Sequence, residues 1–129
     1  MIGVLTFLRS QPDRLAQTID ALQNVIAPSL DSPGCLAIQL HADPRDACRL
    51  MIYEQWLSKT DFDVNGALPQ SQWFWQNRND FLQGDIDIQF FELVAEASQE
   101  SATASEPPAG NSQSTPRTPP SGRTEAREP

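Results

Sequence analysis

Cys35-Leu36-Ala37-Ile38-Gln39-Leu40-His41 and Cys48-Arg49-Leu50-Met51-Ile52-Tyr53-Glu54-Gln55-Trp56 are the two segments on which the fold of this sequence depends. Apolar side chains alternate along both, and a period of two is typical of a half-buried β-strand. Residues 42–47 join them and contain Asp43-Pro44-Arg45-Asp46, in which proline fixes φ and aspartate can bond its own backbone. The pattern predicts a β-hairpin with a short polar turn.

The segment before the hairpin predicts one strand and one helix. Residues 1–8 are nearly all apolar, which favours a strand buried on both faces. A helix capped by Ser10 is expected over residues 12–27, because apolar residues recur there at spacings of three and four. This stripe consists of Leu15, Ile19, Leu22 and Ile26.

The segment after the hairpin predicts helices followed by a strand. Ser58 is the expected cap of a short helix over residues 59–65, and a second helix is expected over residues 69–82. Residues 86–94 predict a last strand. The order β-α-β-β-α-β predicts an α+β, ferredoxin-like domain with a four-stranded antiparallel sheet over residues 1–96.

The charge and length of the chain argue against several classes of partner. Its 129 residues carry a net charge of −8 and a single lysine, a poor balance for holding a phosphate backbone, so we expect no nucleic-acid partner. No apolar run approaches the roughly 20 residues of a membrane span. The N-terminus also lacks the pattern of a signal peptide. The expected compartment is the cytoplasm.

The composition changes near residue 97. Residues 97–129 contain no Leu, Ile, Val, Met or aromatic residue, and they hold six of the eleven prolines. Such a segment buries too little apolar surface to offset the entropy of ordering it. We predict a disordered tail rich in Pro, Ser and Thr, which offers a route to a protein partner, and not a second domain.

The two cysteines predict neither a disulfide nor a metal site. If His41 faces Cys48, Cys35 lies roughly 20 Å from Cys48 along the strand, whereas disulfide Cα atoms lie within about 7 Å. Two cysteines and the single histidine also supply too few ligands for a structural zinc.

The hairpin carries a signature of residues at fixed positions: Pro33-Gly34-Cys35-Leu36, His41, Asp43-Pro44-Arg45-Asp46 and Tyr53-Glu54-Gln55-Trp56. In order and spacing it resembles the antibiotic biosynthesis monooxygenase (ABM) domain family, whose members are small dimeric ferredoxin-like proteins, or dimeric α+β barrels. The order of the elements also fits this family from Met1 to about Val94. The sequence departs from the family at Asn65, which occupies a position where the family often has histidine. Asparagine can hold a hydroxyl or carbonyl by hydrogen bonds but cannot take up a proton near neutral pH.

The resemblance implies a cofactor-independent monooxygenase that oxidises an aromatic polyphenol or quinol with dioxygen. The protein would supply a dry aromatic pocket and a few polar groups that hold the substrate anion. Asn65 and Tyr53 are candidates to orient a substrate oxygen, and His41 is the one side chain whose ordinary pKa lies near neutrality. The expected walls are aromatic: Trp56, Trp73, Phe74 and Trp75.

Structural roles compete with these catalytic ones. His41 stands at a strand end beside a turn, where exposure is common. Three aromatic residues at positions 73–75 cannot all face one way on a helix, so at least one is expected in the core. Asn65 precedes Gly66, and such a pair is typical of a helix C-terminus. For Glu54, which lies in a strand, we expect a contact across a subunit boundary before a role as a base.

Two other functions stay open. The first is a non-catalytic dimeric ligand-binding or scaffolding module of the same fold. The second is a haem-degrading relative, which ranks last because no histidine follows the hairpin. A homodimer is expected in each case, because neighbouring residues such as Val4 and Leu5 place apolar side chains on both faces of the sheet, and helices cover only one.

Overall fold

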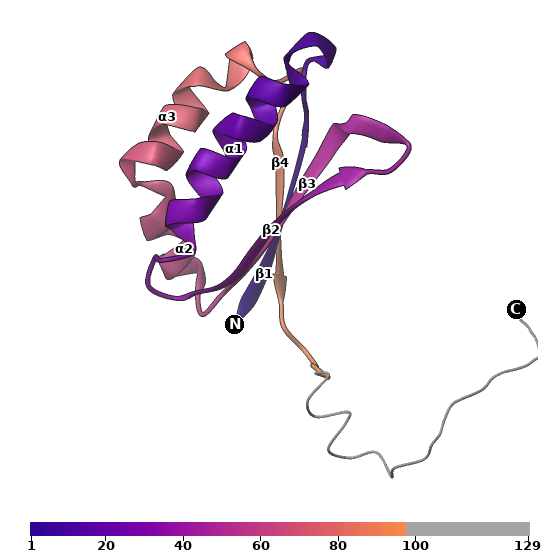
Figure 1. Ribbon diagram of the computed structural model, residues 1–129. Helices are drawn as coiled ribbons and strands as arrows, with labels where there is room; N and C mark the ends of the chain where they lie inside the picture. The colour runs from indigo at the N-terminus through magenta and orange to yellow at the C-terminus, as the bar shows by residue number, and fades with distance from the viewer. Residues whose placement is uncertain (98–129) are drawn as a thin grey trace, which may run out of the picture. The chain divides into compact units, whose positions relative to one another are not determined.

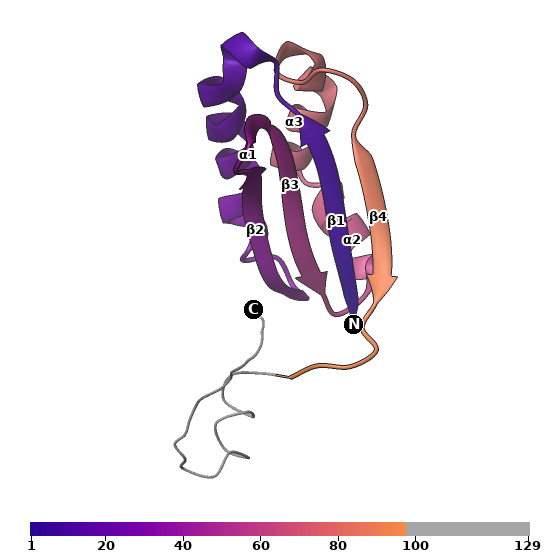
Figure 2. The ribbon, with the colours of Figure 1, turned by 90° about the vertical axis from the view of Figure 1, so that its right-hand side faces the viewer.

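Four strands form one antiparallel sheet in the order β2-β3-β1-β4 (Figure 2). This order is that of the ferredoxin-like fold, and it confirms the fold class expected from the sequence. The computed structural model describes residues 1–97 of the chain. The strands are β1 (Ile2–Arg9), β2 (Cys35–Asp43), β3 (Asp46–Trp56) and β4 (Asp87–Glu92).

All the helices of the described residues lie on one side of this sheet (Figure 1). We call the sheet surface that they cover the covered face, and the other surface the open face. Three α-helices form the layer, with a 3-10 turn before the first and another after the last. These elements are η1 (Pro12–Arg14), α1 (Leu15–Ser29), α2 (Lys59–Gly66), α3 (Pro69–Asn77) and η2 (Arg78–Asp80).

The core lies between the covered face and the helices. Val4, Thr6 and Leu8 alternate along β1 with half-buried residues, and Leu50 and Ile52 do the same along β3. Their alternation gives each strand one buried side, as expected for a sheet covered on one face. The main buried cluster contains Leu8, Ala21, Leu22, Leu50, Ile52, Phe74, Phe81 and Leu82.

The hairpin is confirmed, but its turn is shorter than predicted. Both strands continue through most of residues 42–47, because the Asp43 carboxylate accepts the Arg45 N–H at 2.9 Å and closes the turn locally. The register also differs, since His41 lies opposite Met51 and not Cys48. Both cysteines are nevertheless free, as expected.

The two predicted helix caps have different outcomes. Ser58 does cap α2, where its hydroxyl accepts the Asp61 N–H at 3.2 Å. The prediction for Ser10 is wrong: Ser10 is fully buried and its hydroxyl donates to Thr18 Oγ1 at 2.8 Å, so it ties β1 to α1 instead.

Several ends of elements differ from the prediction. The first helix continues to Ser29 although Pro28 has no N–H to donate to the preceding turn. Beyond it, the Ser29 hydroxyl donates to the Val25 carbonyl at 2.7 Å and the Leu30 N–H to the Ile26 carbonyl at 3.2 Å, which hold the last turn. The helix expected over residues 69–82 ends at Asn77 and tightens into η2. The last strand is shorter than residues 86–94.

The burial of the first strand on the open face differs from the prediction. The strand over residues 1–8 was expected to be buried on both sides, but within one chain Leu5 and Phe7 are only half-buried. Every residue of β4 is exposed. Residues 98–129, which contain almost all of the expected tail, lie outside the described part, so that prediction stays untested. Within residues 1–97, no helix is long and apolar enough to cross a membrane.

Candidate functional site

A cavity of about 150 Å³ lies between the covered face and the helices. Strand residues form its floor, and all three α-helices contribute to its walls. Most lining side chains are apolar, and the polar exceptions are few. They are Thr6, Ser29, Glu54, Asn65 and Ser71.

Glu54 brings a carboxylate to the floor of this cavity. It lies in the middle of β3, two residues from Ile52 and two from Trp56, so strand alternation places all three on the covered face. The side chain is 7% exposed, and its Oε1 accepts the Trp56 indole N–H at 2.9 Å. Burial raises the pKa of Glu54 above its ordinary value, and the bond from Trp56 opposes this in part.

Asn65 brings an amide to the same cavity from the last turn of α2. It is 6% exposed, and its Oδ1 accepts the Ser32 hydroxyl at 2.8 Å. Within residues 1–97 the amide nitrogen has no hydrogen-bond partner. Ser32 therefore holds the amide so that its N–H groups stay available as donors.

The loop before β2 fixes α2, and with it Asn65, against the sheet. Gly34 has a φ of 84°, a conformation that side chains other than glycine rarely adopt. A Cβ atom at this position would also collide with the Asp61 carboxylate. Pro33-Gly34 thus allows the loop to approach the first turn of α2 closely.

Aromatic side chains enclose the remaining walls. Phe62 of α2 packs edge-on against Trp56 and Phe90, with ring centroids 6.1 and 5.4 Å away. Phe74 of α3 is buried and stacks on Phe81 at 6.0 Å. Trp75 also lines the cavity.

The structure brings together some of the residues predicted for the site. Asn65, Phe74 and Trp75 line one cavity, and Trp56 lies behind Glu54, fully buried. Trp73 does not line it: it is 49% exposed and packs on Phe81 outside the cavity. Adjacent positions on α3 point in different directions, which is why these neighbours separate.

His41 and Tyr53 lie on the open face, away from Asn65. Tyr53 precedes Glu54 in β3, so the pleat turns its side chain to the opposite side of the sheet. His41 pairs with Met51 on that same side, and its Nε2 lies 3.0 Å from Gln39 Oε1 at an exposed position. The predicted grouping of Asn65, His41 and Tyr53 in one site is therefore not present within a single chain.

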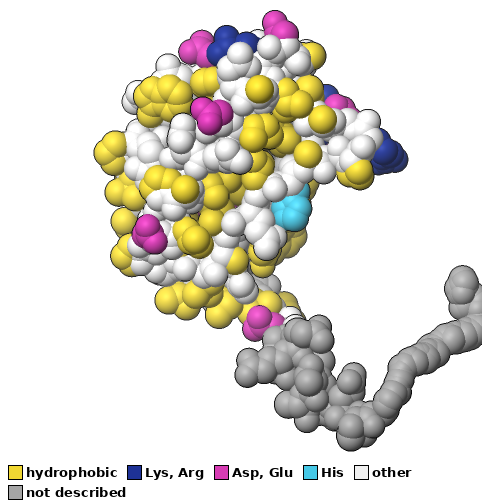
Figure 3. Space-filling view, in the orientation of Figure 1, with side chains coloured by type: hydrophobic (Ala, Val, Ile, Leu, Met, Phe, Trp, Pro, Cys, Tyr) yellow, Lys and Arg dark blue, Asp and Glu magenta, His cyan; other side chains and the backbone are white. Residues whose placement is uncertain are grey.

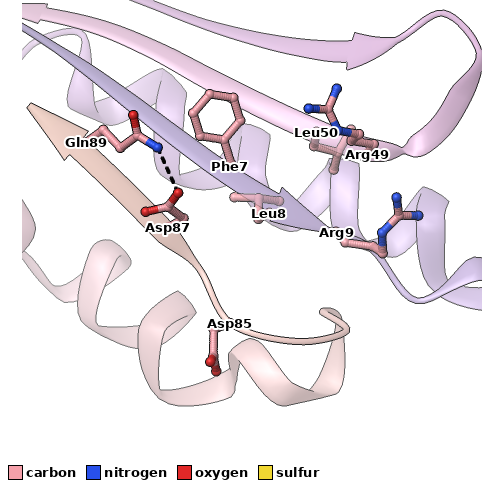
Figure 4. Close-up of a pocket in the computed structure, with 8 residues that line it drawn as sticks. All are labelled: Phe7, Leu8, Arg9, Arg49, Leu50, Asp85, Asp87 and Gln89. Carbon is pink, nitrogen blue, oxygen red and sulfur yellow. Dashed lines mark hydrogen bonds between the residues drawn. The ribbon is translucent and has the colours of Figure 1, made fainter.

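The open face has hollows of its own, which are larger but shallow. One of about 430 Å³ is lined by Phe7, Arg9, Asp87 and Gln89, among others (Figure 4). A second of about 470 Å³ lies beneath the hairpin turn and includes His41, on the side where the outline of the molecule is hollowed (Figure 3). The arginines of these hollows already pair with aspartates.

Most of the hydrogen-bonded and ion-paired groups of these hollows are exposed to water, and Asp43, with its side chain 10% exposed, is the exception. Gln89 Nε2 donates to Asp87 Oδ2 at 2.8 Å, and Arg49 lies 3.2 Å from an Asp43 oxygen. The Arg45 backbone N–H is the largest of the causes that hold the pKa of the Asp43 carboxyl below its ordinary value, followed by the side chains of Arg49 and Arg45. Hydrogen bonds to a substrate anion would be weaker here than in the mostly apolar cavity on the covered face.

Sequence reasoning missed two residues of the cavity. Glu54 was expected at a subunit boundary, and Phe62 was not singled out. The signal for Glu54 was available, because Trp56 is a large aromatic two residues away and a strand places both side chains on one face. Within residues 1–97, no cluster of three or more His, Cys, Asp and Glu side chains could hold a metal ion.

A sequence model of one family, described as antibiotic biosynthesis monooxygenase, matches residues 1–69, which is more than half of the chain. The chain belongs to the antibiotic biosynthesis monooxygenase (ABM) family. The match includes the hairpin signature, α2 and Asn65. No curated protein matches the chain.

Solved structures support the same fold. An antibiotic biosynthesis monooxygenase aligns over 74% of this ABM-family chain and 100% of its own, with 18% identity and a TM-score of 0.69. The protein Rv0793 from Mycobacterium tuberculosis covers 75% of this chain and 98% of its own, with 18% identity and a TM-score of 0.70. PA3566 from Pseudomonas aeruginosa covers 73% and 94%, with 21% identity and a TM-score of 0.68. At these identities the likeness shows the fold alone.

Proposed function

We propose that this ABM-family chain is a cofactor-independent monooxygenase that oxidises an aromatic polyphenol or quinol with dioxygen. The observation that supports this most is the mostly apolar cavity on the covered face, which brings the Asn65 amide and the Glu54 carboxylate together among aliphatic and aromatic side chains. In the overall reaction one quinol and one dioxygen give one hydroxyquinone and one water, so no external reductant is needed.

The geometry suits the activation of an electron-rich phenol. Loss of the hydroxyl proton leaves an anion, and an anion is a far better one-electron donor to dioxygen than the neutral phenol. In a dry cavity, hydrogen bonds from the Asn65 amide N–H groups to that anion are stronger than they would be in water. Ser32 keeps those groups oriented as donors.

The size of the cavity favours a small substrate. About 150 Å³ is less than the roughly 300–1,000 Å³ of a drug-sized ligand site. A single aromatic ring is the better match, and a fused polycyclic substrate would need the wall at Trp75 to move. Trp75 is 46% exposed, so a change of its rotamer meets little resistance from packing.

We also propose that the chain functions as a homodimer that pairs open face against open face. Leu5, Phe7, Met51 and Phe91 place apolar side chains on this surface. Soluble monomers rarely leave such a patch uncovered. Dimerisation would also cover the hollows near His41 and Arg9.

Oxygen uptake with a panel of single-ring and fused quinols and anthrones tests the proposed reaction. We expect uptake of one dioxygen per quinol, with formation of the hydroxyquinone. Ser71→Phe, which fills the cavity from α3, should lower this rate at least tenfold. Gln76→Phe adds the same side chain at an exposed position of α3 outside the cavity, and should leave the rate unchanged.

The second candidate is the non-catalytic ligand-binding module. Asn65 favours it, since an amide in place of histidine removes one proton acceptor from the site. This reading predicts binding of quinols to the parent protein, blocked by Ser71→Phe, without any uptake of oxygen above the uncatalysed rate.

A further inference from the structure

Glu54 is a buried carboxylate without a counter-ion. Within the described residues no Lys, Arg or His forms an ion pair with it. Burying a charge without a partner is costly, so a strand interior would normally carry an apolar residue here. The buried Trp56 indole N–H needs an acceptor here, but a neutral glutamine would supply one, so this bond gives no reason for a charged group.

The surroundings of Glu54 are uncharged on every side. One titratable group interacts with it, the Cys35 thiol, whose pKa is raised first by burial and then by the Glu54 charge. The other side chains of its cavity, including those from α3 and β4, carry no charge. The side chains that face Glu54 across the strand pairs, together with three that share its cavity, come from β1, β2, α1 and α2. They are Val4, Ile38, Ser29, Phe62 and Asn65.

The two carboxylate oxygens of Glu54 differ. The Trp56 indole N–H donates to Oε1 at 2.9 Å and fixes the side chain. Within residues 1–97, Oε2 has no hydrogen-bond partner, although the residue lines the cavity. One oxygen is held in place and the other remains free to accept a proton from a bound molecule.

We propose that Glu54 is the proton acceptor of this cavity, and that its Oε2 takes the proton of a phenolic hydroxyl bound beside Asn65. The O–H bond of the substrate breaks, its electron pair stays on the phenolate oxygen, and the proton forms an O–H bond on Glu54. This step rests on the proposed function and assigns its base. His41 cannot perform it within one chain, because it lies on the open face.

The environment of Glu54 suits this role. A base is most effective when its pKa lies close to the working pH, and burial moves the pKa of Glu54 upward from that of an exposed glutamate. The phenolate that forms is held by the Asn65 amide, so acceptor and donor act on one oxygen atom. Transfer of the proton also removes the uncompensated charge from Glu54.

Glu54→Gln tests the step with little change in shape, because the amide oxygen can still accept the Trp56 N–H. For a quinol that is protonated at the assay pH, we expect kcat/KM to fall by about 100-fold or more. For a phenol that is already ionised at that pH, the loss should shrink to about threefold or less. A merely structural role would lower both rates equally and would overturn the proposal.

The pH profile gives a second readout. The parent should lose kcat/KM at acid pH as Glu54 becomes protonated, and Glu54→Gln should lack this limb. Trp56→Phe removes the hydrogen bond to Oε1, which stabilises the ionised form, so it should move the limb to higher pH. An unchanged limb in both variants would overturn the proposal.

A measurement without turnover separates this proposal from the proposed function. 4-Nitrophenol absorbs differently as phenol and as phenolate, and we expect the parent to bind it as phenolate below its solution pKa, while Glu54→Gln binds the phenol. If this holds but no quinol is oxidised, the monooxygenase proposal fails and the proton acceptor stands. If the parent oxidises quinols but binds 4-nitrophenol only as the phenol, or does not bind it, the role of Glu54 is overturned. If the parent neither binds 4-nitrophenol nor oxidises a quinol, both proposals are overturned.

Discussion

The covered and open faces of the sheet come from the same four strands, yet they have opposite character. On the covered face, β3 presents Glu54 among apolar side chains, and its carboxylate has no ion-pair partner within the described residues. On the open face, Tyr53 and Arg49 of the same strand are half-buried and exposed, on a surface that mixes apolar side chains such as Leu5 with charged ones. A shift of one residue along a strand therefore moves a side chain from the cavity under the helices to the outer surface of the sheet.

The largest expected effect distinguishes two aromatic neighbours of α3. Phe74→Ala should lower the free energy of unfolding by about 3–5 kcal/mol, because the ring is buried against Phe81. Trp73→Ala should cost about 1 kcal/mol, since Trp73 is half exposed. Urea unfolding of both variants measures the difference, and equal losses would contradict the assignment of Phe74 to the core.

The next effect concerns the open face. Leu5→Arg places a charge at the centre of that face, between Tyr53 and Gln89, and should weaken the homodimer by at least about 100-fold, or roughly 2.7 kcal/mol. Gln17→Arg adds the same charge to an exposed position of α1 and should not change association. Sedimentation or light scattering at micromolar concentration measures both. A monomeric parent would refute face-to-face pairing.

Asn65→Ala tests whether the reaction takes place on the covered face of the sheet. Turnover of a quinol should fall about tenfold, or about 1.4 kcal/mol of transition-state stabilisation, because the amide donors to the phenolate are lost. The free energy of unfolding should fall by about 1 kcal/mol, since Ser32 loses its buried acceptor.

Open-face variants supply the controls for Asn65. Tyr53→Phe and His41→Gln should leave turnover within about twofold if the site lies wholly on the covered face. Of the two tryptophans on α3, Trp75→Phe should affect turnover and Trp73→Phe should not, because Trp75 alone lines the cavity. A loss confined to Tyr53 or His41 would move the site to the open face.

Much of the fold, but less of the site, could be predicted from the sequence. Local signals suffice for the hairpin and for the Ser58 cap, because each depends on residues close in the chain. The role of Ser10 could not be predicted, since its partner Thr18 becomes a neighbour only when α1 packs on β1. Asn65 was singled out from its position in the family resemblance, and Phe74 and Trp75 as aromatic walls, and all three line the cavity. His41 and Tyr53 were grouped with them on the chemistry of their side chains, without regard to the face of the sheet on which each strand position lies.

The pH dependence of stability should also distinguish the faces. The pKa of Glu54 is raised in the folded state, so its contribution to stability is full below the ordinary Glu range and is lost as pH rises through the folded pKa. The lowered pKa of Asp43 acts in the other direction: its contribution is present above the ordinary Asp range and is lost as pH falls through the folded pKa.

Urea unfolding between about pH 2.5 and pH 8 checks this sign. Glu54→Gln should gain stability relative to the parent as pH rises, because the parent must then bury a charged carboxylate. The acid-side loss due to Asp43 should be the same in both proteins. If instead the parent became more stable than Glu54→Gln as the pH rises, the ionised Glu54 carboxylate would have a partner.

The smallest expected effect is that of removing residues 97–129. The apolar open face needs a cover, and this segment has no Leu, Ile, Val, Met or aromatic side chain with which to provide one. Ending the chain at Glu96 should therefore change the melting temperature by no more than about 2 °C and leave the dimer mass intact. Calorimetry and light scattering measure the two quantities. A drop of about 10 °C, or a change in association, would assign the segment a docking role and reopen what covers the open face.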